Sequence, residues 1–140
     1  MTPENIAEVR ASWDKVRSDA QGFASEFYRR LFEMDPNLPA LFKSDMQSEG
    51  EKLVQMLDFC VRNLERLDTI LPVIQDFGQR HEYYGFTAQH YESVGRALIA
   101  TLNAQLGEIF TPQVKMAWGE TYTVLAGAMP NSAVPRIQSP

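Results

Sequence analysis

The spacing of apolar residues is the feature of this sequence that most restricts its fold. Along most of the chain they recur with the 3.6-residue period of an α-helix, and no segment shows the period-two alternation of half-buried strands. We therefore predict an all-α fold. The predicted apolar faces are Ile6, Val9, Trp13 and Val16; Phe23, Phe27 and Leu31; Leu53, Leu57, Cys60 and Leu64; Ile74 and Phe77; Tyr91, Val94, Leu98 and Leu102; and Val114, Trp118, Tyr122, Leu125 and Met129.

Capping residues and prolines predict where these helices begin and end. Thr2 and Thr111 are each followed by a proline, which combines a capping hydroxyl with the residue favoured at the first helical position. The prolines between Asp35 and Phe42 exclude a long regular helix there. The other boundaries are expected near Gln21 and Asp35 for the second helix, Ser48 and Leu64 for the third, Asp68 and Gly85 for the fourth, and Thr87 for the fifth.

Length and composition indicate one soluble domain. A chain of 140 residues with 44% hydrophobic residues can bury a core, and we expect a domain over residues 1–129 with an irregular tail at 130–140. Because Cys60 is the single cysteine, an internal disulfide, a four-thiolate metal site and a doubly thioether-linked cofactor are excluded.

Charged residues interrupt the N-terminal apolar stretches, so we expect no signal peptide, no membrane span and a cytoplasmic protein. The formal charge of −5 and the lack of a basic stripe make nucleic acid an unexpected partner.

The two histidines bound the metal chemistry that the chain can perform. His81 follows Phe77 by four residues and Ile74 by seven, which puts its imidazole on an apolar helix face. His90 is nine residues further on, about two and a half turns along an unbroken helix, so the two side chains face opposite ways. They do not share one metal from a single helix, which leaves haem iron, with its single protein ligand, as the metal that this histidine count permits. A buried histidine with a purely structural role is the alternative.

Several markers occur together in one order and spacing. They are Trp13, the Phe27-Tyr28 pair, the Asp35-Pro36 corner, the Leu41-Phe42 pair, the run Phe77-Gly78-Gln79-Arg80-His81, and the run His90-Tyr91-x-x-Val94-Gly95. In these markers the chain resembles bacterial single-domain globins from about Ile6 to Met129. The resemblance implies a globin fold, with six to eight helices around a pocket for haem b, and His81 as the iron ligand.

The resemblance also implies roles for four residues around this group. Tyr91 is similar to the tyrosine that reaches the ligating histidine, and Phe42 to the phenylalanine that packs flat on the porphyrin. Tyr28 matches the phenol that donates a hydrogen bond to bound dioxygen. Dioxygen gains negative charge on binding and carbon monoxide gains little, so this donor favours dioxygen. Leu53 resembles the aliphatic residue that crowds the gas. Ordinary core packing is the alternative for each.

Glu49 departs from the pattern, because relatives carry glutamine or histidine at this position. It precedes Leu53 by four residues and so points along the same apolar stripe. Three states are open: a buried neutral carboxyl that donates to the gas, a carboxylate paired with Lys52, or a side chain turned out to solvent. With no second histidine on this side, Tyr28 or Glu49 is a candidate oxygen ligand for ferric iron. Lys52, Arg80 and Lys43 are candidates for holding the haem propionates.

Three functions compete at this stage. The leading one is reversible dioxygen binding for transport or storage, which also implies carbon monoxide and nitric oxide as ligands. The second is oxidation of nitric oxide to nitrate by bound oxygen, for which we expect a separate reductase, since only 11 residues follow Met129. The third is a haem-based gas sensor or a haem-free globin-like interaction module. Whether the protein is an enzyme is left open.

Overall fold

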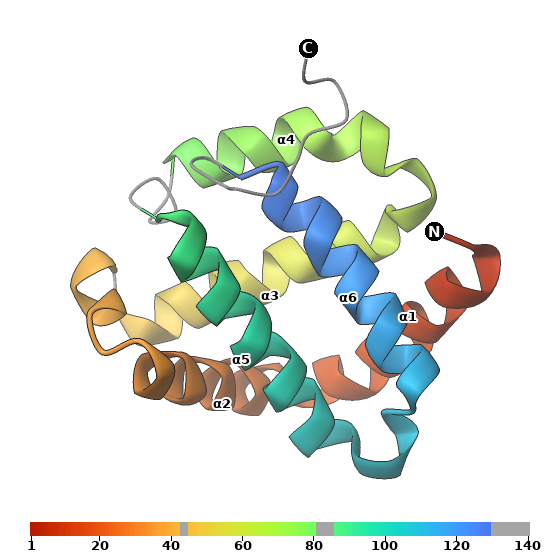
Figure 1. Cartoon of the computed structure of the whole chain (residues 1–140), viewed down its shortest axis with the longest axis horizontal. Coiled ribbons are helices and arrows are strands. Elements are labelled where there is room, and N and C mark those ends of the chain that lie inside the picture. The colour runs from red at the N-terminus through yellow and green to blue at the C-terminus, as the bar shows by residue number, and fades with distance from the viewer. Residues whose placement is uncertain (43–44, 81–85, 130–140) are drawn as a thin grey trace.

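The structure, a computed structural model, describes residues 1–42, 45–80 and 86–129, with the backbone alone for residues 77–80. Within this part the chain forms α-helices and short 3₁₀ turns without any strand, so the all-α prediction is confirmed (Figure 1). The helices are α1 (Pro3–Val16), α2 (Ala20–Met34), α3 (Met46–Arg62), α4 (Leu67–Arg80), α5 (Ala88–Leu106) and α6 (Pro112–Gly127), with 3₁₀ turns η1 (Arg17–Asp19), η2 (Leu38–Leu41), η3 (Leu64–Arg66) and η5 (Gly107–Ile109). None of these helices has the length and apolar run that a membrane crossing needs. The predicted tail at 130–140 lies outside the described residues.

Side-chain caps set the starts of several helices. Thr2 and Thr111 each accept a hydrogen bond from the backbone N–H three residues later, at 3.1 and 3.3 Å, as their sequence context predicts. Asp45 does the same at the start of α3, where its carboxylate accepts from a backbone N–H at 3.0 Å. For this reason α3 begins at Met46, two residues before the predicted Ser48.

The break between the third and fourth helices is not at Asp68, as the sequence analysis predicts, but earlier. The helix α3 ends at Arg62, and α4 begins at Leu67, so Asp68 lies inside α4. Asn63 makes the break. Its side-chain amide donates to the carbonyl of Phe59 at 2.8 Å, and its Oδ1 accepts from Nε of Arg66 at 3.0 Å. The first of these bonds gives the Phe59 carbonyl a side-chain partner, and the backbone N–H of Asn63 bonds to the carbonyl of Cys60 instead.

The pairs α1 with α6 and α2 with α5 form the most extensive helix contacts. Between α1 and α6, Trp13 and Trp118 are fully buried with ring centroids 6.1 Å apart. Nε1 of Trp118 donates to Oγ of Ser12 at 2.8 Å, so the polar atom of this large side chain is satisfied inside the core.

The helices α2 and α3 cross at very short range. A Cβ atom on Gly50 would lie 2.9 Å from Cβ of Ala24, a separation that real side chains do not adopt. Glycine therefore permits the crossing. The close approach sets the first turn of α3, which carries Glu49, against Tyr28 of α2.

Candidate functional site

An aromatic wall joins η2 to the beginning of α5. Phe42 contacts Tyr28 at a centroid distance of 5.5 Å and Phe86 at 5.8 Å, both edge to face, and Phe86 contacts Tyr91 at 5.6 Å. Tyr28, Phe86 and Tyr91 are buried, and Phe42 is half-buried. Rings in contact on several sides are held in place, so the structure offers a rigid apolar surface here.

Tyr28 and Glu49 meet beside this wall. The phenolic O–H of Tyr28 donates to the main-chain carbonyl of Glu49 at 3.3 Å. Glu49 lies in the first turn of α3 with only 3% of its surface exposed. The solvent-facing alternative for Glu49 is therefore wrong, because the short approach of α3 to α2 encloses the residue. The sequence predicts both residues for the site, and the structure brings them together.

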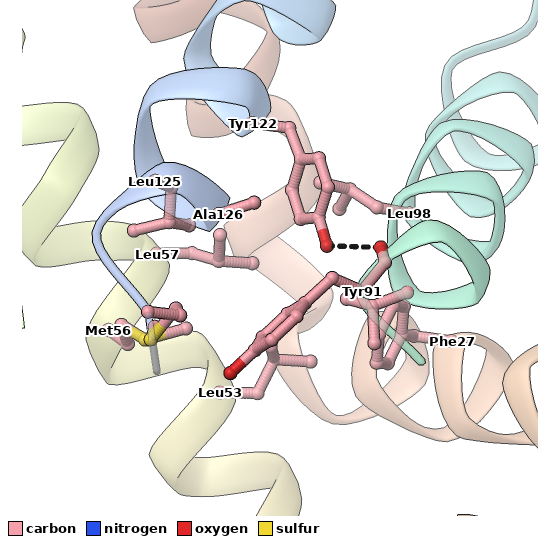
Figure 2. A pocket seen from close by; sticks show the side chains of 11 residues that line it. Phe27, Leu53, Met56, Leu57, Tyr91, Leu98, Tyr122, Leu125 and Ala126 are labelled. Atoms are coloured by element: carbon pink, nitrogen blue, oxygen red, sulfur yellow. Dashed lines mark hydrogen bonds between the residues drawn. The ribbon is translucent and has the colours of Figure 1, made fainter. Parts of the chain in front are cut away.

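A small apolar cavity of about 30 Å³ lies between α2, α3, α5 and α6. It is lined by Phe27, Leu53, Met56, Leu57, Tyr91, Val94, Leu98, Tyr122, Leu125, Ala126 and Met129. Figure 2 shows the ring of Tyr91 extending from α5 towards Leu53 on α3. Burial raises the pKa of the Tyr91 phenol above its ordinary value of 10, so this phenol keeps its proton at neutral pH. Two residues assigned to the site from the sequence, Leu53 and Tyr91, thus share one cavity.

The fifth helix begins after Thr87, as predicted, but the side chains that fix this start were not identified from the sequence. Thr87 donates its backbone N–H to Nδ1 of His90 at 3.0 Å, and Nε2 of His90 lies 3.9 Å from Oδ2 of Asp35 at the end of α2. Phe86 precedes the cap Thr87 and packs on Tyr91, four residues after that cap. This is the hydrophobic staple of a helix start, a signal that is readable in sequence. His90 is therefore a structural residue.

The structure describes only part of the residues predicted to bind the iron and the haem propionates. His81 and Lys43 lie outside the described residues, and only the backbone of Arg80 is described. Lys52 is half-buried on α3. These assignments stay predictions.

Metal binding by side chains alone has no support in the part of the chain that the structure covers. Residues 1–42, 45–80 and 86–129 contain no group of three or more His, Cys, Asp or Glu side chains placed to hold a metal ion. Cys60 is buried, and burial raises the pKa of its thiol from 9.0 to about 12, so it stays protonated in the core.

Comparison with known proteins assigns the family. The family model described as "Globin" matches residues 25–129. The chain belongs to the globin family. It is 27% identical to a neuroglobin of Dissostichus mawsoni, over 86% of this chain and 85% of that protein, and 28% identical to neuroglobin-1 of Oncorhynchus mykiss, over 92% and 90%. It is also 30% identical to a flavohemoprotein of Chromobacterium violaceum over 86% of this chain, which spans only 31% of that relative. The globin fold predicted from the sequence is confirmed.

Globin membership supports haem as the bound group, and the described residues fit it. Haem takes one protein ligand on its iron and otherwise needs a large apolar surface with a few polar groups. The aromatic wall of Tyr28, Phe42 and Phe86 provides such a surface. The phenol of Tyr28 belongs to this wall, and the buried residue Glu49 lies next to it through its main-chain carbonyl.

Proposed function

We propose that this chain is a haem b globin that binds dioxygen reversibly, for transport or storage, with His81 as the protein ligand of the iron. Haem iron, when bound, would supply the coordination position for the gas. The observation that carries the proposal is the contact of Tyr28 with the first turn of α3, beside Phe42. It sets a phenolic donor at the edge of an apolar wall.

Tyr28 would act as the selective donor towards the gas. A phenol has one proton to donate, and its 3.3 Å bond to the carbonyl of Glu49 is long for an O–H donor. Turning the proton from this carbonyl towards a polarised ligand would exchange one hydrogen bond for another. In surroundings of low dielectric this donor favours dioxygen, which gains negative charge, over carbon monoxide.

Glu49 would determine the electrostatic environment of the bound gas on the side of α3. A neutral carboxyl donates a hydrogen bond, whereas a carboxylate repels negative charge on the gas. Glutamine has nearly the same volume and provides an N–H donor without the charge. We therefore expect Glu49→Gln to slow dissociation of dioxygen, measured by rapid mixing with a competing gas.

The first experiment compares two histidine variants. Wild type, His81→Ala and His90→Ala are each titrated with haem, and absorption spectra are recorded in the ferric state, and after reduction under carbon monoxide and under oxygen. We expect saturable uptake and a strong Soret band in wild type and His90→Ala, with weakened binding or an altered spectrum in His81→Ala. His90 is the matched control because its ring is used at the start of α5.

Two results would contradict the proposal. No saturable haem uptake by the wild type would leave a haem-free globin-like module and direct attention to protein partners. Identical spectra of His81→Ala and wild type would place the iron ligand elsewhere.

A second candidate is the oxidation of nitric oxide to nitrate with a separate reductase, favoured by the similarity to proteins named flavohemoprotein. The reaction NO + O₂ + e⁻ → NO₃⁻ balances with one electron per turnover, which the reductase supplies. Sustained turnover with a reconstituted reductase supports this activity. Stoichiometric consumption of a single equivalent of nitric oxide contradicts it.

A further inference from the structure

The outward face of α6 carries a row of uncharged residues with the spacing of a coiled-coil seam. Pro112, Met116, Gly119 and Thr123 follow one another at steps of four, three and four residues, the steps between a and d positions of a heptad. Pro112 and Thr123 are exposed, Gly119 is half-buried, and Met116 has 67% of its surface exposed. The core uses other positions of this helix, namely Val114, Ala117, Trp118, Thr121, Leu125 and Ala126. This row, which we call the α6 seam, therefore faces away from the core.

The middle of the α6 seam is open. A Cβ atom on Gly119 would meet nothing within 4 Å. Gly119 also lines a groove that opens to the outside between α5 and α6, together with Lys115 and Thr123. The hydroxyl of Thr123 donates to the carbonyl of Gly119 at 2.9 Å, so the polar group of this side chain is satisfied within the helix. Because the distance between packed helices depends on the side chains at their contact, a glycine here lets a second helix approach closely.

Opposite charges flank the α6 seam on its two sides. Lys115 precedes Met116 and takes a g position, Glu120 follows Gly119 and takes an e position, and both are exposed. Between two parallel helices, a g side chain faces the e side chain five residues later on the other helix. Lys115 of one copy would then face Glu120 of a second copy, and a twofold axis would repeat the pair. Antiparallel helices would instead bring lysine near lysine and glutamate near glutamate, so the charges favour the parallel arrangement.

Both charged groups are available for such ion pairs. Within the part of the chain that the structure covers, Lys115 has no ion-pair partner. Glu120 accepts a hydrogen bond from Nδ2 of Asn5 through Oε1 at 2.5 Å, and its carboxylate has a second oxygen for another donor. The bond to Asn5 restrains the Glu120 side chain, which reduces the entropy that an ion pair would cost.

We propose that the α6 seam is the interface of a homodimer, in which two copies pack their α6 helices side by side and parallel about a twofold axis. Met116 and Gly119 would meet their counterparts at the centre, with the pairs of Lys115 and Glu120 at the edges. A contact of two 16-residue helices is smaller than a standard interface, so the dimer should form at high protein concentration and separate on dilution. No residue assigned to haem binding from the sequence lies on α6, so the proposal is independent of the proposed function.

Charge reversal followed by restoration tests the ion pairs. Sedimentation equilibrium is measured from about 10 μM to about 1 mM protein, a range suited to a weak interface. Lys115→Glu and Glu120→Lys should each weaken dimerisation about tenfold, the effect of losing two exposed ion pairs. The double variant restores opposite charges across the interface and should return to within about twofold of wild type. Lys15→Glu is the matched control, because it makes the same change of charge at an exposed position of α1 and should leave dimerisation unchanged.

Cysteine cross-linking tests the direction of the two helices. Met116→Cys should give a disulfide-linked dimer under mild oxidation, because in the parallel arrangement position 116 meets its counterpart. Val73→Cys is the control, since Val73 is 55% exposed on α4 and should stay monomeric. The native Cys60 is buried and does not compete.

Three results would overturn the proposal. A wild type that stays monomeric up to about 1 mM would leave this face to a different protein. A double charge variant that dimerises no better than Lys115→Glu would exclude the parallel ion pairs, and equal cross-linking of Met116→Cys and Val73→Cys would exclude the seam. Far-UV circular dichroism of each variant checks that it is folded. Haem uptake is measured separately, so the failure of this inference and the failure of the proposed function give different results.

Discussion

The contact of α1 with α6 and the contact of α2 with α3 bury polar groups in opposite ways. Between α1 and α6, Trp118 and Ser12 bond to each other inside a tightly packed core. Between α2 and α3, a glycine permits a close crossing that encloses the carboxyl-bearing Glu49 beside a phenol. The first arrangement stabilises the fold and carries no reactive group. The second places polar side chains in an apolar setting, as binding sites require.

Truncating the α1–α6 core should have the largest effect. Trp118 is fully buried, and Trp118→Ala removes both its packing and its bond to Ser12. We expect a loss of about 3–5 kcal/mol in the free energy of unfolding. Urea unfolding followed by far-UV circular dichroism measures it. If Trp118→Ala loses no more free energy of unfolding than a surface substitution does, the contact between α1 and α6 does not stabilise the fold as we infer.

Two glycine variants compare close packing with open space. In Gly50→Ala the new Cβ would lie 2.9 Å from Ala24, and we expect a loss of about 1–3 kcal/mol. In Gly119→Ala the methyl group meets nothing within 4 Å, and the better helix propensity of alanine should add up to about 1 kcal/mol. Thermal unfolding of both variants checks the opposite signs. The same sign for both would refute the close α2–α3 crossing.

Tyr28→Phe should separate stability from ligand binding. Loss of the long bond to the Glu49 carbonyl is expected to cost less than about 1 kcal/mol in the free energy of unfolding. Loss of the donor should speed dissociation of dioxygen by about tenfold and change that of carbon monoxide much less. Equal changes for the two gases would mean that the phenol acts through packing alone.

The smallest expected effect lies on the surface between α1 and η3. Arg10 donates two hydrogen bonds to the carboxylate of Glu65, which lowers the pKa of Glu65 from 4.5 to about 2. A lowered folded-state pKa gives stability that is present above the ordinary pKa and lost as the pH falls towards 2. Because the pair is exposed, the effect is small. Urea titrations at pH 6 and pH 3 should show a slightly shallower acid dependence for Glu65→Gln than for wild type.

Much of the fold was predictable because its signals are local. Thr2 and Thr111 cap the helices whose starts they mark in the sequence. The break at Asn63 was not predictable, because several polar residues in that stretch can bond to their own backbone, and the packing around them decides which one ends the helix. At the site, Tyr28, Glu49, Leu53, Phe42 and Tyr91 were identified through the resemblance to globins. The residues that these side chains contact in the fold could not be identified in this way.

The sequence by itself determined the class of fold, the family and the residues of the candidate site, because helical periodicity, caps and ordered markers are properties of the chain alone. Only the tertiary structure decided that Glu49 is enclosed, that His90 is used at the start of α5, and that the phenol of Tyr122 bonds to the carbonyl of Tyr91. Each of these depends on the distance between helices that are far apart in the chain. Packing against partner helices sets that distance, and no local pattern records it.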